Sequence, residues 1–488
     1  MSASAGERVS VVSLGLFEDT KAWRFFVGEK KNGTAHMKNV KDTSTLKEFA
    51  KYVSANVIAM IGLSCYILAD TFFISLKMGQ TGLAALNLSS PSFNIVFSIG
   101  MMFAVGGGTK FAIHKGAKND DEANKVFTHT VLIVAIFAVA FLLLGIFASR
   151  PVAMLLGAEG DTLDYSNTYV QIILCFAPFF MYSNVFQSFV RNDGAPRLAM
   201  IASLSGNLFN IVFDYVLVFP CNLDMLGAAL ATGFSPIFSI LVLSLHVIRK
   251  KNTFHFRKTK LSARTYGGIC SLGLAPFINE ISFATVLTVF NGLFKRLGGD
   301  TAIAAYTIVI NVFYVVNSIF NGVANGTQPM ISYSYGESDH KKIRRILRYA
   351  VVTVSSLAVI LYTAIFFGAD GIASIFNTQG VEALQEEATQ GMRLFFLMAL
   401  FSGFNLLFSY YFSASDRGAY AQLITLLRGL VTIIPIAYLF SYLWKMTGLW
   451  LATPAAELLT LAVTLTLFFL TRPKKTELIP CPEYKKET

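Results

Sequence analysis

Five ionisable side chains lie within long apolar stretches of this 488-residue chain, and they are the residues best placed to do chemistry. An ionised group inside a bilayer costs about 2.5–3.5 kcal/mol or more unless it is paired, protonated or in contact with water. Each of the five is therefore a candidate for binding an ion or a substrate. They are Asp70, Asp214, Glu280, Arg428 and Glu457.

Two of these acids belong to a predicted site made of oxygen-bearing side chains. Asp70, Asp214 and Thr232 each lie about one and a half turns from the same end of a predicted helix, roughly 7–9 Å deep, and Asn210 precedes Asp214 by one turn. Oxygen ligands of this kind suit hard cations, and two buried acids cannot both stay charged without a cation. The set therefore predicts a site for H⁺ or Na⁺. The alternative is that each polar group caps a backbone defect or pairs with a neighbouring helix.

The acids of the second half of the chain allow two interpretations. Glu280 and Glu457 could each face a cleft and attract a cationic substrate. Each could equally be a protonated acid that is hydrogen-bonded within the helix bundle. Arg428 is expected to be a partner for one acid or a packing residue.

Twelve apolar stretches predict the scaffold that positions these residues. With 54% hydrophobic residues, 14% charged residues and a mean hydropathy of +0.56, the composition lies outside the range of soluble globular proteins. Each stretch exceeds the roughly 20 residues that cross a bilayer as a helix, so we predict an all-α membrane protein with twelve transmembrane helices. The predicted spans are 52–76, 82–113, 127–149, 165–190, 196–219, 226–248, 267–294, 302–331, 349–369, 392–413, 419–443 and 448–471.

The second half of the sequence repeats the first. "LKMGQTGLAALN" (76–87) returns as "KRLGGDTAIAAY" (295–306), and "GAALATGFS" returns as "GLWLATPAA". Six spans bring the chain back to the side on which it entered, so the repeat is parallel and predicts two six-helix lobes around a V-shaped cleft. The predicted parts are a polar tail (1–46), a first lobe (47–250), a cytoplasmic linker that serves as the hinge (251–264), a second lobe (265–472) and a cytoplasmic tail (473–488).

Repeated glycines close the second span of each half. Gly108 aligns with Gly326, and Gly116 aligns with Gly336. Glycines at such positions are typical of closely packed membrane helices and of turns. We expect both roles here.

The repeat also serves as an internal control for the predicted ion site. Aligning Gly194 with Gly418 places Asn210 opposite Ile434 and Asp214 opposite Tyr438, and Asp70 falls near Asn291. A purely structural role for the acids would be expected in both lobes. The asymmetry therefore favours an ion site in the first lobe.

The formal charge of +11 does not indicate a nucleic-acid partner, because its placement follows membrane topology. With the amino terminus inside, the short cytoplasmic loops carry 18 Lys and Arg residues against 6 in the outer loops. Both termini are therefore expected in the cytoplasm.

Sequence motifs for catalysis or nucleotide binding are absent, so we expect neither an enzyme nor a cofactor. The chain has no Walker A, GxSxG or HExxH sequence. Its five cysteines, scattered and odd in number, form neither a disulfide framework nor a metal-binding spacing. The energy source that remains is an ion gradient, unless the protein is a passive carrier.

The sequence resembles the multidrug and toxic compound extrusion (MATE) transporters over about residues 47–471. The matching elements are "AD" followed by "LAALN", then "QSFVRNDGAPRLAM", "NIVFD" and "GAALAT", while "NGTQPMISYSYGESD" looks most like the bacterial MepA/DinF-type branch. The resemblance implies twelve helices in two lobes and export of organic, often cationic compounds in exchange for Na⁺ or H⁺. It also differs in one respect: the first span has no proline, although relatives often bend there.

The resemblance assigns roles to individual residues. Its first-lobe ion site matches Asp70, Asn210, Asp214 and Thr232, which would bind H⁺, or Na⁺ if the protein is coupled to Na⁺. The residues expected to line the substrate cleft are Tyr66, Tyr169, Gln187, Glu280, Asn291 and Glu457.

We therefore expect a monomeric, multi-pass antiporter of the inner (plasma) membrane that exports organic, cationic, drug-like compounds by alternating access. Its partners would be the substrate and the lipid bilayer. The alternative is a lipid-linked precursor flippase, or an exporter of a specific metabolite, on the same two-lobe scaffold.

Overall fold

The computed structural model describes residues 35–377 and 380–471, and the regular structure within these ranges is helical, without strands. Residues 1–46 and 47–488 form separate units, and the fold described below is that of the second unit. The predicted carboxyl-terminal tail (473–488) and most of the predicted amino-terminal tail (1–34) lie outside the described residues. The all-α fold class is confirmed.

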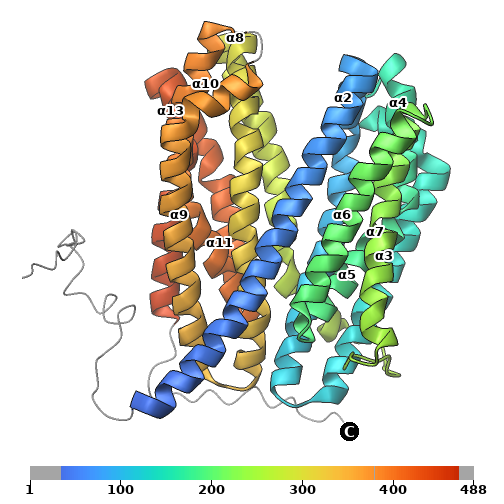
Figure 1. Cartoon of the computed structure of the whole chain (residues 1–488), viewed down its shortest axis with the longest axis vertical. Coiled ribbons are helices and arrows are strands. Elements are labelled where there is room, and N and C mark those ends of the chain that lie inside the picture. Colours follow the sequence, from blue (N-terminus) through green and yellow to red (C-terminus); the bar gives the residue numbers. More distant parts are fainter. Residues whose placement is uncertain (1–34, 378–379, 472–488) are drawn as a thin grey trace, which may run out of the picture. The chain divides into compact units, whose positions relative to one another are not determined.

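The helices form two groups that follow each other along the chain (Figure 1). In the first group α3 to α7 pack against one another, and in the second group α8 to α13 do so. The first group consists of α2 (Ala35–Gly116), α3 (Asp120–Leu155), α4 (Asp161–Cys175), α5 (Ala177–Asn192), α6 (Pro196–Val218) and α7 (Asp224–Ile248). The second consists of α8 (Ala263–Gly336), α9 (His340–Phe376), α10 (Glu382–Phe395), α11 (Ala399–Ala414), α12 (Gly418–Leu426) and α13 (Ile433–Leu470).

Breaks divide the longest helices. Gly79 in α2 and Gly299 in α8 have φ angles of 60° and 64°, a left-handed conformation that glycine adopts without a steric penalty. These two breaks recur at equivalent places in the repeat. In α13 the break falls at Trp444 and Lys445, and α4 and α5 are bent by 48° where they meet.

The number of spans depends on how these breaks are counted. Nine helices of the described chain are long and apolar enough to cross a membrane, or ten if α4 and α5 form one span. Counting α8 as two spans, and the run from α12 to α13 as two, would give the predicted twelve. That exact number remains a prediction.

The two lobes meet closely at one end of the second unit, where the turns 117–119, 193–195, 249–262 and 337–339 lie; we call it the basic end. Here α2 approaches α8 at backbone distance, because a Cβ atom on Gly106 would overlap the carbonyl oxygen of Ile269. The contact is reciprocal, since a Cβ on Gly273 would overlap the carbonyl oxygen of Met102. Only glycine permits this approach.

A second pair of contacts closes the same end. A Cβ on Gly116 would overlap the carbonyl oxygen of Tyr333, and a Cβ on Gly336 would overlap that of Ile113. The close packing predicted for Gly116 and Gly336 is thus confirmed, and it joins the two lobes. Gly326 also faces the other lobe, since a Cβ atom there would lie 2.8 Å from the Cα atom of Val53 on α2. We call these five inter-lobe glycines the glycine seam: Gly106, Gly116, Gly273, Gly326 and Gly336.

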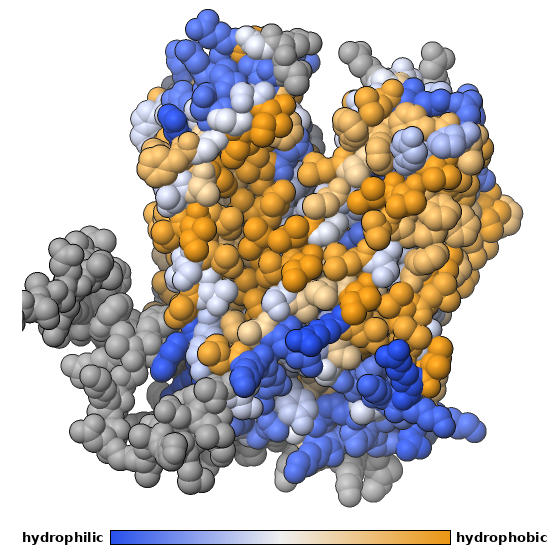
Figure 2. Space-filling view, in the orientation of Figure 1, coloured by the Kyte–Doolittle hydropathy of each residue, from blue (hydrophilic) through white to orange (hydrophobic). Residues whose placement is uncertain are grey.

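The space-filling view shows the surface expected of a multi-pass membrane protein. A broad apolar band covers the middle of the helices, and hydrophilic side chains gather at the two ends (Figure 2). Between the lobes the surface is hollowed at the end away from the glycine seam. The lobes therefore touch at one end and diverge toward the other.

Candidate functional site

The two acids of the first lobe meet in its interior. Asp70 comes from α2 and Asp214 from α6, and their side chains lie within hydrogen-bonding range of each other. Asp70 is 7% exposed and Asp214 is fully buried. Two carboxyl groups this close can share a hydrogen bond only when one of them is protonated.

Asn210 and Thr232 complete the predicted oxygen set. In one orientation of the Asn210 amide, its Nδ2 donates to Thr232 Oγ1 at 3.2 Å. Turning the amide over satisfies more groups, because Nδ2 then donates to Asp214 Oδ2 at 3.2 Å and Oδ1 accepts from the Thr232 hydroxyl at 3.2 Å and from its N–H at 3.3 Å. In that orientation Asn210 links the acid on α6 to the start of α7.

Two buried tyrosines line the same site. Tyr169, on α4, lies within hydrogen-bonding range of Thr232 and in electrostatic range of Asp70 and Asp214. Tyr66 lies one turn before Asp70 on α2 and is in range of both carboxyl groups. Six of the residues predicted for ion binding and cleft lining therefore converge from α2, α4, α6 and α7. We call this set the acid site.

Two carboxyl oxygens of the acid site could bind a small cation. Asp70 Oδ1 and Asp214 Oδ1 are both buried and have no hydrogen-bond partner. Two carboxylate oxygens, an amide and a hydroxyl form a donor set of hard oxygens, which suits H⁺ or Na⁺ as a transported ion. Within the described chain no cluster of three or more His, Cys, Asp or Glu residues forms a metal centre.

Glu457 is placed differently from its predicted role in the cleft. It is 5% exposed, and its Oε1 accepts hydrogen bonds from Arg428 at 2.7 and 3.1 Å. Its Oε2 accepts from Asn405 Nδ2 at 2.7 Å. Of the roles left open for Arg428, the structure shows the acid partner. Glu457 is thus ion-paired with Arg428 within the second lobe.

The remaining predicted cleft residues lie apart from the acid site. Glu280, on α8, is partly buried; it accepts a hydrogen bond from Asn279 at 3.4 Å and faces Tyr314 and Tyr410. Asn291 is half-buried on the same helix. The side-chain amide of Gln187 donates to the carbonyl oxygen of Ala199 at 3.5 Å, at the start of α6, and makes no contact with the acids.

Sequence reasoning missed a buried arginine. Arg191, assigned to a cytoplasmic loop, is 5% exposed and donates to Asn56 Oδ1 at 2.8 Å. It lies in electrostatic range of Tyr410 from the second lobe, and its Nε has no hydrogen-bond partner. The available signal was the apolar run that ends directly before it in "NVFQSFVR".

The buried positions of the second lobe nearest to those aligned with Asn210 and Asp214 are apolar. Ile433 and Ala437 are 6% and 0% exposed, and each lies one residue before the aligned Ile434 and Tyr438, of which Tyr438 is 51% exposed. The second lobe therefore has no acid at these positions, which is the asymmetry that the sequence predicted.

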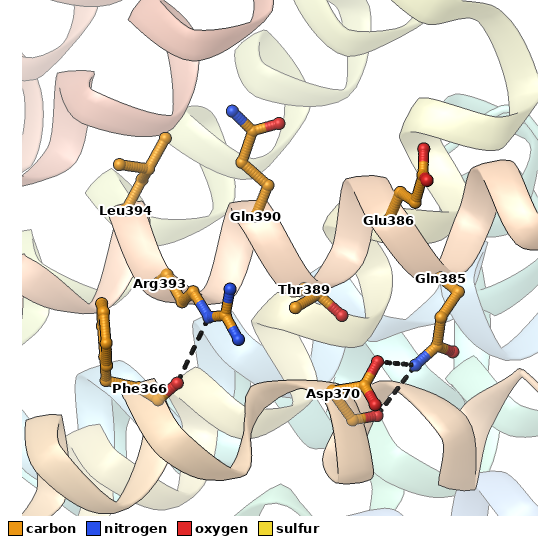
Figure 3. Close-up of a pocket in the computed structure, with 8 residues that line it drawn as sticks. All are labelled: Phe366, Asp370, Gln385, Glu386, Thr389, Gln390, Arg393 and Leu394. Carbon is orange, nitrogen blue, oxygen red and sulfur yellow. Dashed lines mark hydrogen bonds between the residues drawn. The ribbon is translucent and has the colours of Figure 1, made fainter.

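A surface groove of about 640 Å³ lies between α9 and α10 of the second lobe (Figure 3). Gln385 Nε2 donates to Asp370 across it at 2.7 Å, and Arg393 Nε donates to the carbonyl oxygen of Phe366 at 3.3 Å. The groove contains none of the residues predicted for ion or substrate binding. It is a surface feature of one lobe and lies apart from the acid site.

The sequence model of the MatE family matches residues 56–216 and 277–439. The multidrug export protein MepA of Staphylococcus saprophyticus is 27% identical over 408 residues, which cover 83% of this chain and 89% of the relative. MepA of Staphylococcus aureus is 26% identical over the same shares.

Solved structures share the fold. A multidrug resistance MATE family transporter of the MOP superfamily in an outward-facing conformation superposes with a TM-score of 0.83 at 20% identity, covering 92% of this chain and 98% of the other. A MOP superfamily transporter from Pyrococcus furiosus, whose binding pocket is described as reversed in polarity, gives 0.82 at the same identity and coverage. These transporters have the two-lobe architecture seen here.

Proposed function

Because the chain belongs to the MatE family of membrane transporters, we propose that it exports organic, cationic compounds across the plasma membrane in exchange for H⁺ or Na⁺. Its relatives of similar length are named multidrug export proteins, which supports drug-like compounds as the substrates. The positive charges of the short loops support an orientation with both termini in the cytoplasm.

The observation that carries the proposal is the close approach of the buried Asp70 and Asp214 side chains. Two acids buried side by side cannot both be ionised without a compensating positive charge. The pair therefore takes up a proton or Na⁺ from one side of the membrane and must lose it when the surroundings change. Because the pair binds the ion on one side of the membrane and releases it on the other, ion binding changes the relative free energies of the two conformations.

The positions of the ligands explain how ion binding would be coupled to movement. The acid site joins α2, α4, α6 and α7, and the first of these also carries two of the five glycines of the glycine seam. A bound ion screens the two acids and draws these helices together. Loss of the ion restores the repulsion, so the two ion states favour different helix arrangements, and alternating access follows from their difference in free energy.

Ion-driven transport by purified protein in proteoliposomes tests the proposal. Asp70→Asn and Asp214→Asn keep the shape of each side chain and remove the titratable group, so we expect gradient-driven transport to be abolished while substrate still binds. Asn210→Ala and Thr232→Ala remove neutral ligands, and we expect roughly tenfold losses or less. Imposing a pH gradient and a Na⁺ gradient separately identifies the coupling ion.

Asp164→Asn is the matched control, because this acid of the same lobe is exposed and paired with Arg150 at the surface. It should transport at the wild-type rate. Wild-type transport by both Asp70→Asn and Asp214→Asn would remove the acid site from the mechanism, and coupling would then be sought at Glu280.

A further inference from the structure

The segment that connects the lobes lies along the first lobe, although the sequence predicted a free hinge there. The backbone N–H of Thr253 donates to Asp193 Oδ2 at 2.8 Å, and that of His255 donates to Asn124 Oδ1 at 2.7 Å. The N–H of Arg257 donates to Oγ1 of a threonine on α3, Thr128, at 3.0 Å. We call residues 252–259 the strap.

The spacing of these hydrogen bonds shows that the strap fits α3. In an extended chain alternate N–H groups point the same way and recur about every 6.6–6.8 Å. Residues four apart on an α-helix lie on one face with a rise of about 6 Å. Asn124 and Thr128 are four apart, and they receive the N–H groups of His255 and Arg257. The distance between alternate N–H groups of the strap therefore matches the distance between their acceptors along α3.

Aromatic packing fixes the strap between its hydrogen bonds. Phe254 is 5% exposed, and its ring centroid lies 4.9 Å from that of Phe127 on α3 and 6.1 Å from that of Phe189 on α5. Phe256 packs against the same Phe127 at 5.1 Å. A linker that moved freely would leave the Phe254 ring in water.

Asp193 joins the strap to the helices around it. Its side chain, 4% exposed, lies in the turn between α5 and α6 and accepts from His246 Nε2 of α7 at 2.9 Å. The same carboxylate accepts from both the N–H and the hydroxyl of Thr253. One buried acid thus holds the end of α7, the α5–α6 turn and the beginning of the strap together.

Docking of the strap leaves a short connection between the lobes. The last anchor is Thr259, whose Oγ1 lies 3.1 Å from His129 Nε2, and α8 is capped by Ser262, whose Oγ accepts from the N–H of Thr265 at 3.3 Å. Only Lys260 and Leu261, both exposed, lie between them. Fully extended, this piece spans roughly 10–11 Å, whereas 251–262 without docking would span roughly 36–40 Å.

We propose that Asp193 is a positioning residue that docks the strap on the first lobe, so that residues 260–261 are the effective tether and limit how far the lobes separate at the basic end. The inference rests on the proposed function only in that the lobes move relative to each other. The docking itself is independent of which ion or substrate is transported.

Two insertions of the same composition test the tether. Gly-Ser-Gly-Ser inserted after Leu261 lengthens the free piece, whereas the same insertion after Lys251 adds slack on the far side of the anchors. Spin labels on Ala117→Cys and Glu337→Cys, in full-length protein whose five native cysteines are replaced, report the distance between the lobes at the basic end. We expect at least a twofold larger population of long distances with the first insertion and an unchanged distribution with the second. Equal effects of the two insertions would contradict the proposal that residues 260–261 limit the separation of the lobes.

Removing the anchors of the strap should make the insertion after Lys251, which has no effect in the docked protein, increase the distance between the lobes. Asp193→Asn combined with Asn124→Leu, Thr128→Val, His129→Leu and Phe254→Ala removes the anchors of the strap up to and including that of Thr259. The insertion after Lys251 should then increase the long distances as the other insertion does. A merely structural role for Asp193 would lower thermal stability and leave that insertion silent. Lys258→Gln is the matched control on the strap, because its side chain is exposed. With this change the strap should stay docked, and the insertion after Lys251 should still leave the distances unchanged.

Hydrogen exchange separates this inference from the proposed function. The amides of Thr253, His255 and Arg257 should exchange at least tenfold more slowly than those of Lys260 and Leu261 in the wild-type protein. Equal, fast exchange would exclude docking, whatever the protein transports. Failure of ion coupling in the Asp70 and Asp214 variants would leave this protection and the insertion result in place.

Discussion

Gly116 and Gly336 occupy equivalent positions in the two halves of the chain and face each other across the lobes. Each leaves room for the backbone of the other half: Gly116 for the carbonyl oxygen of Tyr333, and Gly336 for that of Ile113. Because each carbonyl belongs to the residue three positions before the opposing glycine, the crossing of α2 and α8 follows the symmetry of the repeat. Closure at the basic end therefore depends on the absence of two Cβ atoms.

Adding one Cβ at this crossing should open the basic end. Gly116→Ala or Gly336→Ala would push a methyl group into a backbone carbonyl, which cannot move aside as a flexible side chain can. We expect longer distances between spin labels at the basic end and a transport rate at least about tenfold lower. Gly371→Ala is the control, because nothing lies within 4 Å of its Cβ position, and in a helix this change stabilises by up to about 1 kcal/mol. A closed basic end in Gly116→Ala would contradict the prediction.

Breaking the ion pair of the second lobe should destabilise the protein. Glu457→Gln leaves the Arg428 guanidinium buried without a counter-charge, and such a loss costs about 3–5 kcal/mol. We expect a clearly lower unfolding temperature in detergent. The double variant Glu457→Gln with Arg428→Met removes both charges and should recover most of the loss. Equal stability of Glu457→Gln and wild type would show that the pair is dispensable.

Neutralising Glu280 should affect cationic substrates selectively. This acid is partly buried among tyrosines and has no cationic partner among its hydrogen bonds, so it remains available to attract a positively charged compound. We expect Glu280→Gln to lower transport of a cationic dye several-fold more than transport of a neutral analogue of similar size. Glu457→Gln supplies the comparison, since its charge is already paired and any loss should be equal for both compounds. Equal loss for Glu280→Gln would indicate a role in folding.

The strap should be inaccessible from outside the cell. Lys258 is exposed on it, and the segregation of positive charge predicts that this segment lies in the cytoplasm. A cysteine at this position, in a background without the native cysteines, should react with a membrane-impermeant reagent only after the cells are opened. Labelling of intact cells would invert the proposed topology.

The first-lobe acid site was predictable because its signals are local. Polar residues in a membrane helix are few, so Asp70, Asn210, Asp214 and Thr232 stand out, and distance from the helix ends places them at one depth. The structure brings these four together with Tyr66 and Tyr169. Their function as an ion site stays a prediction that the transport experiments test.

Contacts between segments distant in the sequence were not predictable. Nothing within "RKKNTFHFRKTK" indicates that its N–H groups would find acceptors at Asp193 and Asn124, which lie far earlier in the chain. The partner of Glu457 was named only as one option, because Arg428 lies 29 residues away on a different helix. In the repeat, Gly106 matches Gly326 in packing, since each lies ten residues before a seam glycine and touches the other lobe, whereas Gly108 packs against Ser188 within its own lobe.

The π-helical turn at Leu427–Val431, between α12 and α13, has a consequence for how the two halves diverged. In α6 the corresponding stretch is continuous α-helix. A π turn changes the helical phase of the residues that follow it, and beyond it the buried Ile433 and Ala437 each lie one position before the residues aligned with Asn210 and Asp214. One copy of a duplicated helix can therefore present a different set of side chains to the lobe interior while the helix itself is kept. Divergence in chemistry between the two copies is then possible while their architecture is inherited unchanged.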